Sequence, residues 1–154
     1  MENQQSGTSD GISQSDWEGI TEIAFRLADA LLREDRQAET EERDALLTAL
    51  DVLQDKYGDR PSILASRAEF LDDKNESIAL YEKAYSLADE TNDFQNKTFV
   101  ASSLASLHWH VLEDRQNAEL WLERLKDCLR DYTDDNEQDT YHALRRDLIS
   151  VVKE

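Results

Sequence analysis

Turn-forming residues are scarce in this sequence. Its 154 residues include only four glycines and one proline, and three of those glycines (Gly7, Gly11 and Gly19) lie near the start. A β-sandwich or a protein built of hairpins needs turn residues roughly every ten positions along the chain. The scarcity therefore excludes those architectures and favours long helices.

Cysteine and long hydrophobic runs are also nearly absent. Cys128 is the only cysteine, so no intrachain disulfide can form and nothing indicates an oxidising compartment. No segment approaches the roughly 18 consecutive apolar residues of a membrane span. The first residues, MENQQ, are unlike a secretory signal because they are neither basic nor apolar. We therefore expect a cytoplasmic protein that does not insert into a membrane.

Positive charge is in short supply. The chain has 17 Lys and Arg against 35 Asp and Glu, a formal net charge of −18. Such a chain repels nucleic-acid phosphates and anionic membrane surfaces, since both are polyanions. The charge either serves solubility alone or steers the protein toward a basic partner.

Apolar residues recur at helical spacing from Ser15 onward. The pattern predicts an all-α fold, a single domain over residues 15–154 with about seven helices in consecutive antiparallel pairs. The first helix is expected to open at Ser15 with a capping box, and the second near Thr40. Residues 1–14 offer little to bury, so they are expected to form a disordered acidic and polar tail.

Part of the chain resembles the tetratricopeptide repeat, a family of paired helices. Ser77, Tyr81 and Ala84 match the small, large and small positions of the second helix of that repeat, and Leu64 and Ala65 match the large–small pair of the first. The resemblance implies a right-handed helical stack whose concave face binds a peptide or protein segment. An ordinary helical bundle is the alternative.

A second copy of the motif begins near Asp114 and continues through Leu122 and Leu125. The two copies are spaced more widely than the usual period of about 34 residues. The resemblance covers residues 59–132 and implies that the inner face of the first helix in each pair binds the partner. The protein-binding residues expected from it are Ser62, Ser66, Glu69 and His110.

The segment 98–112 contains no formally charged side chain. A helix without a charged face is surrounded by neighbours or covers a partner site. We expect it to be the buried central helix, with Trp109 in the core. The alternative is that His108 or His110 is exposed beside Trp109 as a binding hot spot.

Motifs for catalysis and metal binding are missing. The sequence has no phosphate-binding glycine loop, no H-E-x-x-H and no G-x-S-x-G. His108 and His110 are two residues apart, which turns them to different sides of a helix. The acidic run 134–139 lacks the glycine of a calcium loop. We therefore expect neither an enzyme nor a cofactor or metal site.

These features favour a protein that acts by binding another protein. The leading hypothesis is a small immunity protein that neutralises a bacterial toxin, because such proteins are similar in being small, acidic and cytoplasmic. It would be a monomer that forms a heterodimer with a basic toxin domain. The alternative is a secretion chaperone or scaffold adaptor that holds an extended peptide, and a third hypothesis is a dimeric regulator that uses residues 98–112 as its interface.

Overall fold

The chain is all-α over the residues that the structure describes, 7–153. A computed structural model gives seven α-helices and one π-helical segment there, with no β-strand, which confirms the predicted fold class. None of these helices is both long and apolar enough to cross a membrane. Contacts within the chain group it into two compact units, residues 1–77 and 78–154. The expected single domain over residues 15–154 stays a prediction.

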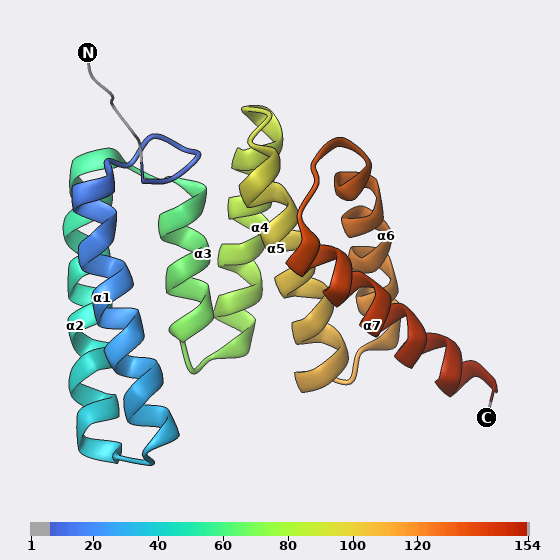
Figure 1. Ribbon diagram of the computed structural model, residues 1–154, viewed down its shortest axis with the longest axis horizontal. Coiled ribbons are helices and arrows are strands. Elements are labelled where there is room, and N and C mark those ends of the chain that lie inside the picture. The colour runs from blue at the N-terminus through green and yellow to red at the C-terminus, as the bar shows by residue number, and fades with distance from the viewer. Residues whose placement is uncertain (1–6, 154) are drawn as a thin grey trace. The chain divides into compact units, whose positions relative to one another are not determined.

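Three helices lie side by side in the first unit (Figure 1). They are α1 (Gln14–Leu32), α2 (Arg36–Tyr57) and α3 (Pro61–Phe70). α1 and α2 form a hairpin, and α3 packs against α2. Burying apolar side chains between helices removes them from water, which is the main stabilising term in such a unit. The core residues are Ile12, Ile20, Leu27, Leu46, Leu50, Leu53 and Ile63.

The chain before α1 folds against this unit from Gly7 onward. Ile12 is fully buried in the core, and the amide of Gly7 donates to the carbonyl oxygen of Ile12 at 2.8 Å. The disordered tail expected over residues 1–14 is therefore wrong for its described part. Ile12 has only glycine and polar residues as neighbours in the sequence, so no local pattern predicts its burial. The core residues that it packs against come from later helices. Residues 1–6 lie outside the described residues.

The second unit begins within the fourth helix, at Ile78. α5 packs against α6, and α7 packs against both; Figure 1 shows α7, in red, running obliquely past α6. The elements are α4 (Lys74–Glu90), α5 (Phe94–Ser106), the π-helical segment η1 (Leu107–Val111), α6 (Arg115–Asp131) and α7 (Asp135–Lys153).

An aromatic cluster ties α4, α5 and α6 together. The rings of Tyr85 and Trp121 meet edge to face with centroids 5.0 Å apart. The guanidinium of Arg124 lies 4.4 Å from the Trp121 ring centroid, and the Lys97 ammonium lies 5.7 Å from that of Tyr85. Lys97 also forms an ion pair with Asp89 at 2.6 Å. These contacts combine ring packing with cation–π attraction.

The uncharged segment 98–112 corresponds to most of α5 and to η1. On α5, most of its side chains are buried, as expected for a central helix. Trp109 on η1 is only half-buried, so its expected place in the core is wrong. The buried members on α5 are Thr98, Val100, Ala101, Ser102, Leu104 and Ala105.

An oxygen-bearing side chain stands just before every α-helix except α3 in the described part of the chain. Ser13, not Ser15, caps α1, and its hydroxyl accepts the Asp16 amide at 3.1 Å. The second helix begins at Arg36, earlier than the expected Thr40, because the Asp35 carboxylate caps it. Such caps satisfy amides that the helix itself leaves unpaired. The other aspartates that accept first-turn amides from just before a helix are Asp73, Asp93, Asp114 and Asp134.

The hairpin turns use left-handed residues other than glycine. Glu34 and Asn92 have φ of 54° and 57°. The next amide, of Asp35 or Asp93, donates to an alanine carbonyl of the helix that has just ended, at 3.0 and 2.8 Å. This is the Schellman arrangement of a helix end, and the same aspartate then caps the following helix. A three-residue connection suffices, so few glycines are needed.

The residues that carry the repeat resemblance are buried. Ser77 is 1% exposed, and its hydroxyl donates to the Ala68 carbonyl oxygen at 2.7 Å. Tyr81 and Ala84 are 6% and 0% exposed. This burial is compatible with a tetratricopeptide-like pair and equally with an ordinary bundle, so the repeat-like packing stays a prediction.

Two glycines at the start of the chain are expected to respond oppositely to alanine. A Cβ at Gly7 would lie 2.7 Å from the Gln14 Cα, whereas a Cβ at Gly19 would meet nothing within 4 Å. Gly7→Ala should lower the free energy of unfolding by about 1–3 kcal/mol. Gly19→Ala, inside α1, should raise it by about 0.5–1 kcal/mol. Urea unfolding followed by circular dichroism measures both, and a neutral Gly7→Ala would contradict the packing of this segment.

Candidate functional site

The binding residues expected on α3 share one side of that helix. Ser62 is buried, and its hydroxyl and amide donate to the Asp10 carboxylate at 3.0 and 2.7 Å. Asp10 therefore caps α3 from outside the helix, because Arg60 before it makes no capping bond. Ser66 is half-buried and Glu69 is exposed. Ser62 has a structural contact, whereas Ser66 and Glu69 present surface to solvent.

His110 is exposed on η1, in the second unit, whereas the three α3 residues lie in the first. His108 on the same segment is only 5% exposed. Its Nδ1 has no hydrogen-bond partner among the described residues and lies 3.8 Å from Asp114 Oδ2. Hydrogen bonds from the side-chain amide and the backbone amide of Asn117 lower the pKa of Asp114. Of the two histidines, only His110 is placed to meet a partner.

One face of α1 combines acidic and apolar side chains and remains exposed. Phe25 and Leu32 are 76% and 84% exposed. Glu18, Glu22 and Asp29 are exposed between and beside them, at spacings of three and four residues that keep all five on one side of the helix. We call these five residues the α1 face. Phe25 and Leu32 stand about two helical turns apart on this face, where each is available as an apolar anchor beside carboxylates.

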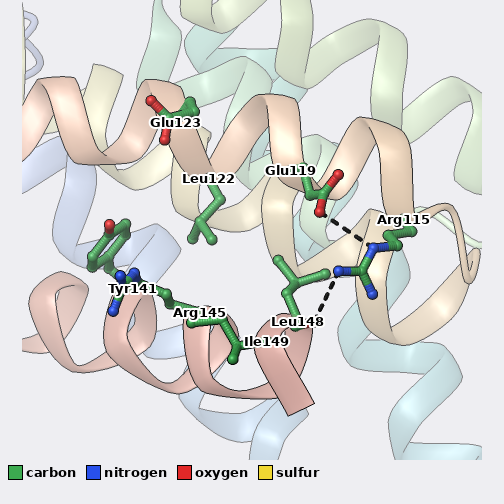
Figure 2. Close-up of a pocket in the computed structure, with 8 residues that line it drawn as sticks. All are labelled: Arg115, Glu119, Leu122, Glu123, Tyr141, Arg145, Leu148 and Ile149. Atoms are coloured by element: carbon green, nitrogen blue, oxygen red, sulfur yellow. Dashed lines mark hydrogen bonds and ion pairs between the residues drawn. The ribbon is translucent and has the colours of Figure 1, made fainter. Parts of the chain in front are cut away.

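A groove runs between α6 and α7 in the second unit. Figure 2 shows Leu122 from α6 and Leu148 from α7 directed toward each other, with Arg115 at one end. They line a hollow of about 450 Å³. Arg115 is held in place, since its guanidinium donates to the Leu148 carbonyl oxygen at 2.8 Å and pairs with Glu119 at 3.2 Å. The hollow is also lined by Glu123, Tyr141, Arg145 and Ile149.

A second hollow of about 300 Å³ continues the groove. Tyr141 lines both hollows, so they adjoin at this residue. The other residues lining the second hollow are Lys126, Leu129, Arg130, Gln138 and His142. Basic residues therefore outnumber acidic ones along the groove, although the whole chain carries −18. We call the two hollows together the α6/α7 groove.

The two surfaces differ in the groups that they offer for contact. Among the residues the structure describes, no group of three or more His, Cys, Asp or Glu side chains is placed to hold a metal ion. The α1 face offers carboxylates and apolar groups, and the α6/α7 groove offers apolar groups and cations. Both sets can contact a complementary protein surface.

No protein-family model, curated protein or solved structure matches this chain.

Sequence reasoning missed both surfaces for identifiable reasons. The helical spacing of Ile20, Ile23, Ala24 and Leu27 predicts that Leu31 continues the buried stripe of the first helix. In the structure Leu31 is 46% exposed and Ala30 is buried instead. Phe25 and Leu32 lie outside the apolar stripe of this helix. Large apolar residues outside such a stripe indicate exposed apolar surface, so the sequence did carry a signal for the α1 face. The groove depends on which sides of α6 and α7 meet, which no local pattern discloses.

Glu69 provides a test of local electrostatics at a predicted binding residue. Although the side chain is exposed, desolvation by the surrounding protein raises the pKa of Glu69. The folded state therefore disfavours the charged carboxylate, and this cost is present at neutral pH and absent once the group is protonated in both states.

Glu69→Gln should therefore raise the melting temperature at about pH 7 and leave it unchanged at about pH 4. Glu82→Gln is the matched control, since Glu82 is an exposed acid on α4 and its removal changes the net charge equally. Calorimetry of both variants at the two pH values measures the difference. An equal gain for both variants would contradict a specific effect at Glu69.

Proposed function

We propose that this chain is a non-catalytic protein-binding module that binds one basic partner protein stoichiometrically and inhibits it. In its specific form, the chain is an immunity protein that neutralises a bacterial toxin or effector in the cytoplasm. The observation that carries the proposal is the α1 face, where Phe25 and Leu32 stand exposed among carboxylates.

Binding at this face combines two physical contributions. The net charge of −18 attracts a basic domain over a distance of about one Debye length and raises the rate of encounter. Phe25 and Leu32 then supply apolar contact area, which slows dissociation. A partner whose active site is a basic cleft would be occluded by the bound helix.

The second candidate function is that of a secretion chaperone or scaffold adaptor. The observation that favours it is the α6/α7 groove, whose apolar floor and adjoining hollows would accept a protein segment. The two candidates differ in what they require of the partner. An inhibitor needs the folded domain, whereas an adaptor binds a short segment taken out of its protein.

The test uses the folded product of the neighbouring reading frame as the probe. We expect a 1:1 complex by sedimentation, loss of the activity of that product, and an affinity that falls as salt rises. Replacing both anchors, Phe25→Ser with Leu32→Ser, should weaken the complex at least about tenfold.

Val52→Ser is the matched control, because Val52 is 61% exposed on α2 and lies outside the α1 face. It should leave the affinity unchanged. If the double variant binds as the parent chain does, the α1 face is not the contact surface. If a short unfolded peptide of the partner binds as tightly as the folded domain, the adaptor function replaces the inhibitor.

A further inference from the structure

We propose that the α6/α7 groove is a second docking surface, which accepts an amphipathic helix of another protein that carries carboxylates. This inference does not depend on the α1 face, whose charge has the opposite sign. One chain would then have two contact surfaces, the α1 face for a basic partner and the α6/α7 groove for an acidic one.

The floor of the groove is apolar and incompletely covered. Leu122 and Leu148 are 8% and 5% exposed, whereas Ile149 beside them is 40% exposed. Tyr141 lies where the two hollows adjoin. Apolar side chains from an incoming segment would fill both hollows and remove Ile149 from water, a favourable transfer of apolar surface.

The groove has the form that suits a helix. The residues lining it on α6 run from Arg115 to Arg130, which spans about 22 Å at the rise of an α-helix. That length corresponds to about four helical turns. A third helix can pack its ridge of side chains into the depression between two others. In such helix-in-groove complexes, apolar residues three and four positions apart on the bound helix contact the groove.

Two cations and one acid along the groove, Lys126, Arg145 and Glu123, have no partner within the part of the chain that the structure describes, so the groove offers a small excess of positive charge to an occupant. Arg115 is engaged by Glu119 and Arg130 by Asp127. Lys126 on α6 and Arg145 on α7 are exposed and form no hydrogen bond or ion pair with the described residues. Carboxylates on the two sides of a docked helix can reach these groups, and a basic helix would be repelled by them.

The probe is a designed helical peptide of about four turns, with leucines on one side and glutamates flanking them. A second peptide has lysine in place of each glutamate. We expect the glutamate peptide to bind the full chain with at least about tenfold higher affinity than the lysine peptide in fluorescence titrations. Equal binding of the two peptides would overturn the proposal.

Variants of the groove locate the site. Lys126→Glu combined with Arg145→Glu should reverse the preference between the peptides, and Ile149→Ser should weaken both. Arg36→Glu is the matched control, since Arg36 is an exposed cation outside the groove, and it should leave the preference unchanged. A double variant that keeps the parental preference would overturn the assignment.

A second copy of this chain is the competing occupant, because its α1 face is also acidic and apolar. Sedimentation of the purified chain decides between them. We expect a monomer. An oligomer that Ile149→Ser and Phe25→Ser each dissociate would mean that the groove serves self-association, and the proposal would be wrong. The Phe25→Ser variant should still bind the glutamate peptide, so failure at the α1 face remains distinguishable from failure at the groove.

Discussion

Carboxylates at helix N-termini hold this fold together at its turns. Asp35, Asp93 and Asp114 each accept an amide of the helix they precede, at 3.1 to 3.2 Å. Each follows a residue with φ between 52° and 57° that is not glycine. A negative charge at this end of a helix is also favoured by the helix dipole. Because one aspartate both completes one helix end and starts the next helix, long helices follow each other with almost no glycine or proline.

Part of the negative charge is therefore structural. Asp10 is used to cap α3, and Asp16 pairs with Lys56 and accepts from Tyr57, contacts that lower the pKa of its carboxyl. Net charge by itself consequently does not mark a partner surface. Acids with no such role are more informative, and Glu18 and Glu22 on the α1 face stand beside exposed apolar groups. Structural acids and partner-binding acids are distinguished by their contacts in the fold, and the amino-acid composition gives no information on these contacts.

The fold class could be predicted because the scarcity of turn residues and the helical period both act locally. The segment before α1 could not, since Ile12 and Asp10 gain their partners from helices far along the chain. The sequence also carries a local signal for two of the turns: the residues E-D-R-Q occur at 34–37 and again at 113–116. In each copy the aspartate is the last residue of the turn and caps the helix that begins at the arginine. The groove required knowledge of which sides of α6 and α7 meet.

The two surfaces differ in the distance over which their charges act. At physiological salt a field decays over about 8 Å, so an approaching protein first meets the net charge of −18 and only later an individual side chain. A basic partner is thus attracted before contact. An acidic helix that binds at Lys126 and Arg145 is not attracted before contact. Its apolar residues must therefore supply most of its affinity for the groove. Association of an acidic helix with the groove should therefore be slower than association of a basic partner with the α1 face, because the long-range field opposes its approach until its carboxylates reach Lys126 and Arg145.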